Sequence, residues 1–135
     1  MNEDMIADGR CCLDTNILID VSRKKATAIA FLEELEENFE VCCSIVSSFE
    51  MLSGARNKRE QKTITDFLDR FTVLAIDEAI SWQALDWYVQ YHLSHGTGFL
   101  DCLIGATVFQ YSIPVYTLNT KHFSMFPGLD LRRPY

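Results

Sequence analysis

Three carboxylates and one amide occupy positions where their side chains could meet at one edge of a folded sheet. Asp14 ends a short apolar run near the start of the chain. A buried strand that runs into a turn delivers its last side chain to the carboxyl edge of the sheet, where ligands bind in open α/β folds. Asn119 comes just past another expected strand, and Glu50 and Asp101 lie near the starts of expected helices. If these side chains share one edge, the chain carries an acidic site there.

The chemistry of such a site is that of a divalent cation. Three carboxylates packed close together would repel one another and raise one another's pKa values. A metal ion relieves that repulsion, and oxygen ligands without a cluster of Cys or His favour Mg²⁺ or Mn²⁺ over zinc. Such ions activate water and stabilise the charge that develops on a phosphodiester. The chain has no Walker loop, no G-x-S-x-G motif and no H-E-x-x-H motif that would indicate other chemistry.

Each of these residues also has an ordinary structural explanation. Glu50 borders an apolar stripe that includes Phe49, and it could be a residue at the boundary of the core. Asp101 could cap its helix, where the helix dipole favours negative charge, and Asn119 could belong to a turn. The site is favoured because Asp101 lies on an apolar helix face, where an ionised carboxylate without partners costs several kcal/mol.

The composition fits one globular domain. The 135 residues, of which 48% are apolar, suffice for a single core, and we expect one domain over residues 1–135 with a loose tail at 1–9. The net charge of −7, from 19 acidic and 12 basic residues, argues against a general phosphate-binding surface. The basic residues nevertheless form three clusters, which are either solvated surface or contacts for substrate phosphates or an acidic partner. These clusters are Arg23–Lys25; Arg56, Lys58, Arg59 and Lys62; and Arg132–Arg133.

The five cysteines favour buried, reduced thiols over a metal clip. They are Cys11, Cys12, Cys42, Cys43 and Cys102. No C-x-x-C motif occurs, adjacent cysteines on a strand point to opposite faces, and all five lie in apolar stretches. The apolar stretches are too short for a membrane span, and residues 1–9 do not resemble a signal peptide. We therefore expect a cytoplasmic protein that does not associate with membranes.

Strands and helices alternate along the chain, which favours a parallel sheet covered by helices on both faces. We expect strands ending at Asp14 and at 41–44, 72–76, 115–118 and around 129–131. We expect helices beginning at Ile17 and at 26–37, 46–55, around 64–71, from 77 to near 96, and 99–111. The aromatic residues sit at core spacing, so we expect them inside the protein rather than on a base-stacking surface.

The order of these motifs resembles the PIN-domain ribonucleases, and most closely the VapC-type toxins of bacterial and archaeal toxin–antitoxin pairs. The resemblance runs nearly end to end. It is carried by four segments in sequence, Leu13–Leu18, Ser44–Glu50, Asp101–Thr107 and Thr117–Leu129. Each segment is modest by itself, but four in order at suitable spacing make a specific pattern.

The resemblance implies a fold and an activity. The fold would be a three-layer α/β sandwich whose central parallel sheet has five strands in the order 3-2-1-4-5, flanked by helices. The activity would be hydrolysis of RNA phosphodiester bonds by a water molecule activated by Mg²⁺, with Mn²⁺ as substitute. The implied partners are an RNA substrate, a small cognate antitoxin and a second copy of the chain in a homodimer.

The resemblance also implies roles for particular residues. Asp14, Glu50 and Asp101 would be the metal ligands and, together with Asn119 at the fourth position, the catalytic residues. At the position of Asn119 many members have aspartate and many toxins have asparagine. Because Asn119 and His122 are uncharged or weakly basic, a second metal position is in doubt. We therefore expect one tightly held ion, with a second arriving with the substrate.

Four further positions match supporting residues of the family. Thr15 and Asn16 match the polar residues that support the first aspartate, and Thr117 matches a hydroxyl beside the fourth position. His122 stands where relatives often carry another acid.

Two alternatives remain open at the level of sequence. The substitutions at Asn119 and His122 would also suit a PIN-like RNA- or protein-binding module whose catalytic site is weakened. A Mg²⁺-dependent phosphatase or receiver-like domain is the other alternative. A haloacid-type phosphatase, however, requires Asp-x-Asp where this chain has Asp14-Thr15-Asn16.

Overall fold

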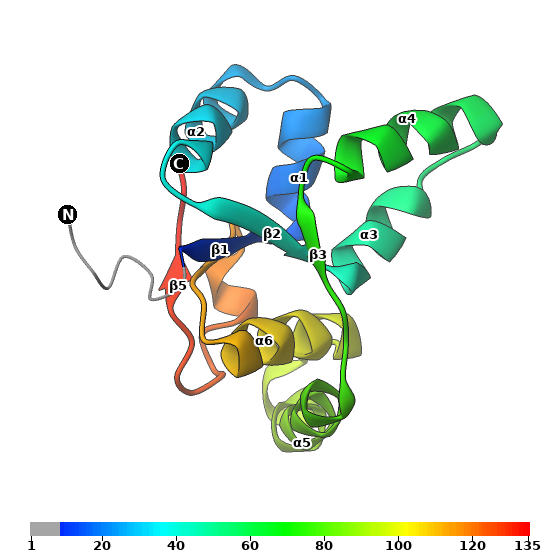
Figure 1. Ribbon diagram of the computed structural model, residues 1–135. Helices are drawn as coiled ribbons and strands as arrows, with labels where there is room; N and C mark the ends of the chain where they lie inside the picture. Colours follow the sequence, from blue (N-terminus) through cyan, green and yellow to red (C-terminus); the bar gives the residue numbers. More distant parts are fainter. Residues whose placement is uncertain (1–8) are drawn as a thin grey trace.

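The computed structural model describes residues 9–135, and within them it contains one parallel sheet of five strands in the order β3-β2-β1-β4-β5 (Figure 1). The strands are β1 (Arg10–Leu13), β2 (Glu40–Ser44), β3 (Thr72–Leu74), β4 (Val115–Tyr116) and β5 (Leu131–Arg132). This order confirms the expected 3-2-1-4-5 topology. Apart from Gly9, the expected N-terminal tail lies outside the described residues.

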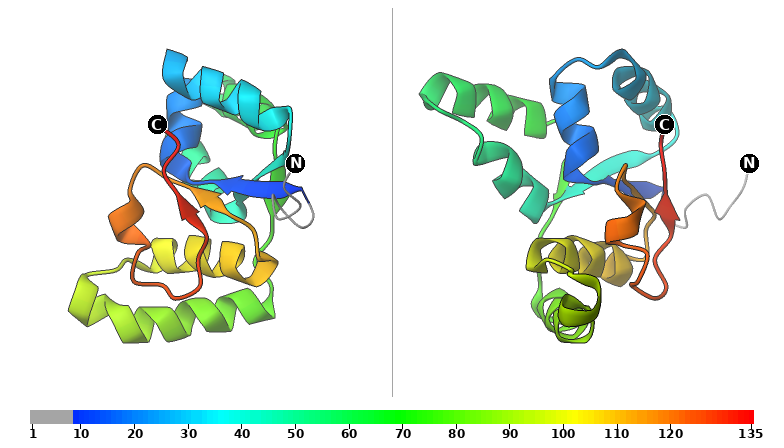
Figure 2. Two further views of the ribbon diagram at one scale, coloured as in Figure 1. Left: turned by 90° about the vertical axis from the view of Figure 1, so that its left-hand side faces the viewer. Right: turned by 180° about the vertical axis from the view of Figure 1, so that it is seen from behind.

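Helices cover both faces of the sheet, which confirms the expected three-layer sandwich (Figures 1 and 2). They are α1 (Thr15–Ser22), α2 (Ala26–Glu36), α3 (Ile45–Leu52), α4 (Lys58–Leu68), α5 (Glu78–His95) and α6 (Phe99–Tyr111), with a short 3₁₀ turn η1 (Thr120–His122). In Figure 1, α1, α2 and α4 lie above the sheet, and α5 and α6 lie below it. Helix α3 contacts both α1 and α6, so it joins the two layers at the end of β2. None of the helices in the described part of the chain is both long and apolar enough to cross a membrane.

The alternation of side chains along the central strands divides the core between the two faces of the sheet. Cys11 and Cys43 pack with α1 and α2, whereas Cys12 and Cys42 pack against Val108 of α6 on the opposite face. Side chains alternate because successive residues of a strand point to opposite faces. All five cysteines are buried and free, as the sequence predicted.

The first helix begins two residues earlier than expected. Asp14 itself is the N-cap of α1, and its Oδ1 accepts a hydrogen bond from the backbone N–H of Thr15. The expectation of a helix beginning at Ile17 was therefore wrong, because α1 begins at Thr15. Asp14 directly follows β1 and is also the N-cap of α1, so no loop separates the strand from the helix.

The expectation that the aromatic residues lie in the core is wrong for four of them. The exposed aromatic residues are Phe49 at 69%, Trp82 at 63%, Phe99 at 60% and Phe109 at 36%. Helix α5 packs on the outside of α6, so only its inner face, which carries Ile80 and Trp87, is buried. Apolar residues on its other side have no layer to pack against in a single copy of the chain.

A tight glycine-bounded loop connects α5 to α6. Gly96 ends α5 with φ of +66°, in the left-handed region that glycine adopts without steric cost. Gly98 is the N-cap of α6, and Asp101 lies in the first turn of that helix. The loop therefore sets where the Asp101 carboxylate stands relative to the sheet.

Candidate active site at the carboxyl edge of the sheet

Asp14 is fixed at the end of β1 by hydrogen bonds to both of its carboxylate oxygens. The parallel pairing of Leu13 with Tyr116 places the residue after β4, Thr117, beside Asp14. The Thr117 hydroxyl donates to Asp14 Oδ2 over 2.7 Å, and the N–H of Thr15 donates to Oδ1 over 2.8 Å. Asp14 is only 6% exposed, so this carboxylate is held in one orientation.

Asn16 and Asn119 are tied to the same hydroxyl. The side-chain amide of Asn16 donates to Thr117 Oγ1 over 3.3 Å, and the backbone N–H of Asn119 donates to it over 3.0 Å. The Asn16 side-chain oxygen in turn accepts from the N–H of Leu118 over 3.4 Å. The Asn119 side chain is exposed and makes no capping hydrogen bond to η1.

Glu50 reaches the site from α3 through a hydroxyl pair that the sequence did not reveal. Thr15 Oγ1 lies 2.5 Å from Glu50 Oε1 and 2.7 Å from the hydroxyl of Ser47, which is fully buried. Thr15 has one hydroxyl proton, so when it donates to the carboxylate, Ser47 is placed to donate to Thr15. Ser47 stands three residues before Glu50, on the same face of the helix. This spacing is the sequence feature that could have indicated Ser47 as a residue of the site. Glu50 itself lies near the end of α3, not near its start as expected.

Asp101 faces His122 across the entrance of the site. Nδ1 of His122 lies 3.4 Å from Asp101 Oδ2, and the Asp101 side chain is 31% exposed. An imidazole is thus in contact with one of the predicted ligands.

The charges of the three acids act on one another although they come from distant parts of the chain. Burial raises the pKa of Asp14, and the Glu50 charge raises it further, against the hydrogen bonds from Thr117 and Thr15. Burial also raises the pKa of Asp101, as do the charges of Asp14 and Glu50, while His122 lowers it. The fold thus gathers Asp14, Glu50 and Asp101 within electrostatic reach, in surroundings that disfavour the ionised forms of Asp14 and Asp101.

The donor chemistry fits a hard divalent cation, because a cation would relieve the repulsion among these carboxylates. In the described residues, however, no three carboxylate, imidazole or thiol groups lie close enough together to hold a metal ion. Glu50 is hydrogen-bonded to Thr15, and Asp101 faces His122. The ligand set of Asp14, Glu50 and Asp101 stays a prediction.

Comparison with known proteins shows to which family this chain belongs. The family model of the PIN domain matches residues 11–127. The chain is 33% identical to ribonuclease VapC19 of Mycobacterium tuberculosis over 125 residues, which cover 91% of this chain and 98% of that protein. It is 31% identical to ribonuclease VapC10 of the same species over 118 residues, 87% of this chain and 88% of that one.

A solved structure agrees with the sequence comparison. A toxin–antitoxin complex from Klebsiella pneumoniae superposes with a TM-score of 0.75 at 25% identity, over 93% of this chain and 98% of that chain. The residues that the family model matches include Asp14, Glu50 and Asp101. The chain therefore belongs to the PIN-domain family and, within it, to the VapC ribonucleases.

Proposed function

We propose that this protein is a metal-dependent endoribonuclease that hydrolyses RNA phosphodiester bonds with Mg²⁺, for which Mn²⁺ can substitute. The observation that carries the proposal is the gathering of Asp14, Glu50 and Asp101 from β1, α3 and α6 at one edge of the sheet. These residues supply the negative charge that a divalent ion requires, in a chain whose relatives are named ribonucleases.

Asp14, Glu50 and Asp101 would hold the ion, with Asp14 as the most rigidly oriented ligand. When bound, the ion supplies an activated water molecule and stabilises charge on the phosphodiester. Thr117 and Thr15 fix the Asp14 carboxylate. Glu50, which is hydrogen-bonded to Thr15, and Asp101, which faces His122, would turn towards Asp14 when the ion binds. The exposed Asn119 amide can contact the reacting phosphate. One tightly held ion, joined by a second with the substrate, suits a site in which Asn119 is uncharged.

We further propose that the protein is the toxin of a type II toxin–antitoxin pair and acts in the cytoplasm. The solved Klebsiella relative is a toxin–antitoxin complex, which supports a cognate antitoxin as partner. We also propose a homodimer, because apolar side chains of α5 stand exposed on the surface of the single chain.

The test is cleavage of a mixed RNA pool by the purified protein, measured with Mg²⁺, with Mn²⁺ and with EDTA. Cutting should require the metal, and Asp101→Asn should reduce it by about 100-fold or more because a ligand is lost. Asp86→Asn makes the same charge change at an exposed position of α5 and should cut like the wild type.

The possible failures have different meanings. A folded, antitoxin-free protein that cuts under no condition would favour the RNA- or protein-binding module, the alternative suggested by Asn119 and His122. Cutting that survives both EDTA and Asp101→Asn would come from a contaminating nuclease.

A further inference from the structure

A hollow of about 230 Å³ adjoins the acidic site on the side away from Asp14. It lies between the end of α5 and the turn η1, and Asp101 and His122 form the wall that it shares with the acidic site. Its other walls include Thr97 from the α5–α6 loop and Lys121 from η1. None of the roles proposed above uses this space.

Thr97 lines this hollow, and its side-chain hydroxyl is buried without a partner among the described residues. The residue is 5% exposed, and its Oγ1 has no hydrogen-bond partner among the described residues. Leaving a buried hydroxyl unpaired costs free energy, so such groups usually meet a ligand or water. The backbone around it is held, because Nδ1 of His92 lies 3.1 Å from the Thr97 carbonyl oxygen, which can only accept. The hydroxyl is therefore a fixed polar group that the protein itself does not satisfy.

The surroundings of Thr97 favour an anion. Lys121 contributes an exposed ammonium group, and the imidazole of His95 can donate an N–H even when neutral. The Nδ1 atom of His122 faces Asp101 instead. The hollow adjoins the first turn of α6, a helix of 13 residues whose N-cap, Gly98, offers no side-chain hydrogen bond. A helix N-terminus with uncapped N–H groups attracts phosphate. Apart from the residues next to them in the chain, no described residue has an atom within 4 Å of where a Cβ at Gly96 or Gly98 would stand, so these glycines border open space.

We propose that this hollow binds a phosphate of the RNA strand next to the bond that is cut, an inference that rests on the proposed ribonuclease function. A polynucleotide carries phosphates on both sides of the scissile bond, and Asp101 stands between the hollow and the acidic cluster. The Asp101 charge opposes an anion, so the phosphate lies towards Thr97, Lys121 and the α6 N-terminus. Thr97 and Lys121 are then substrate-positioning residues.

The experiment measures RNA binding without cleavage. A fluorescent, mixed-sequence single strand of RNA, about 12 nucleotides long by the span of known single-strand sites, is titrated with the full chain in EDTA at several salt concentrations. Lys121→Gln should weaken binding about three- to tenfold and reduce the slope of log affinity against log salt by about 0.7, the value for one lost contact to a single strand. Thr97→Val should weaken binding about two- to tenfold with the slope unchanged, because a neutral hydrogen bond is lost.

A matched control separates this site from general electrostatic attraction. Lys62→Gln removes the same charge from the exposed face of α4, where Lys62 pairs with Asp66, and it should change neither affinity nor slope. Thermal unfolding of each variant establishes that the fold is retained. Equal effects of Lys121→Gln and Lys62→Gln, or no effect of Lys121→Gln and Thr97→Val, would overturn the proposal.

Backbone amide NMR shifts locate the bound strand. The RNA should shift the amides of residues 97–101, and inorganic phosphate should shift the same amides more weakly. A response to inorganic phosphate with none to RNA would overturn the assignment to a nucleic-acid strand. Because no metal is present, these results do not depend on whether the protein cuts RNA. Failure of the cleavage assay and failure of this proposal are therefore distinguishable.

Discussion

At the scale of single residues, hydroxyl groups decide how the acidic site is held. Thr117 donates to Asp14, and Thr15 lies within hydrogen-bond distance of both Glu50 and Ser47. The hydrogen bond from Thr117 lowers the pKa of Asp14, against the effect of burial. The Thr117 hydroxyl therefore keeps the buried Asp14 carboxylate closer to its ionised form without adding positive charge, which leaves the attraction for a cation intact.

Asp101 should make the metal-free protein less stable as the pH rises. Its pKa in the folded state is raised above the ordinary value of about 3.9, so the folded state keeps this proton to higher pH than the unfolded state does. The stability that the protonated group contributes is fully present below the ordinary pKa and is lost as the pH rises through the raised one.

Asp101→Asn removes this loss because the amide does not ionise. In EDTA at pH 7 the variant should unfold at a higher temperature than the wild type, and the difference should shrink as the pH falls towards 4. Thermal unfolding across this range measures the effect, and Asp86→Asn should show no such pH dependence. An advantage that is equal at both ends of the range would contradict the electrostatic explanation.

At the scale of elements, close packing of α6 against its neighbours positions Asp101. Gly105 lies on the buried face of α6, and a Cβ there would stand 2.9 Å from two ring atoms of Phe126. The Phe126 ring is itself stacked on Trp87 of α5, with ring centroids 4.5 Å apart. A side chain at Gly105 would therefore push α6, whose first turn carries Asp101, away from the Phe126 ring.

Gly105→Ala should lower the free energy of unfolding by about 1–3 kcal/mol, the usual cost of overpacking a core. The matched variant is Gly54→Ala, whose Cβ would lie 3.5 Å from the Met51 carbonyl oxygen, an ordinary contact. Gly54→Ala should be neutral or stabilise by about 0.4–1 kcal/mol, since it restricts the unfolded chain. Denaturant unfolding compares the two, and equal stabilities would show that the Phe126 ring moves aside at no cost.

The sequence patterns predicted the strands and helices better than they predicted the contacts between side chains of different elements. Alternating strands and helices gave the parallel sheet, and Phe99–Tyr111 is a helix with the expected bounds. The hydroxyl of Ser47 could not be assigned, because its partner Thr15 lies 32 residues away and meets it only in the fold. The exposure of Trp82 was likewise hidden, since helical periodicity does not show which face another layer will cover.

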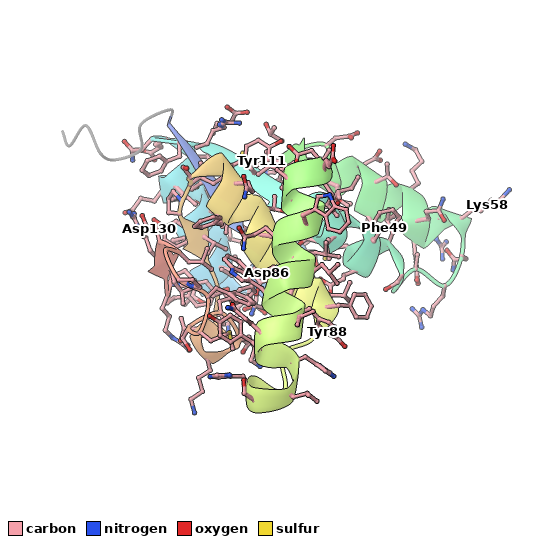
Figure 3. The ribbon with its side chains drawn as sticks, turned by 90° about the horizontal axis from the view of Figure 1, so that it is seen from below. Phe49, Lys58, Asp86, Tyr88, Tyr111 and Asp130 are labelled. Carbon is pink, nitrogen blue, oxygen red and sulfur yellow. The ribbon has the colours of Figure 1, made fainter. Side chains whose placement is uncertain are left out.

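At the scale of the whole molecule, the outer side of α5 carries an apolar stripe. Trp82, Leu85, Val89 and Leu93 recur at helical spacing and are 63%, 50%, 74% and 93% exposed. Below Leu85 lies an apolar hollow of about 190 Å³ that reaches Phe99 and Leu103 of α6. Figure 3, which views the molecule from this side, shows α5 in front of α6, with Phe49 and Tyr88 on the right-hand side. A surface of this kind is typical of a protein–protein interface.

The homodimer that we propose should form through this stripe, because it is the largest set of exposed apolar side chains on one helix in the described chain. Leu85→Glu would place a charge at the centre of the interface, where it must lose its hydration without gaining a partner. We expect the dissociation constant of the dimer to rise by about 100-fold, the scale of a central interface residue.

Gln90→Glu adds the same charge at another exposed position of α5 and should leave the dimer intact. Size-exclusion chromatography with light scattering over a dilution series gives the mass directly. If the wild type has the mass of one chain at every concentration, the homodimer proposal is wrong, and the apolar stripe would then be assigned to contact with the antitoxin.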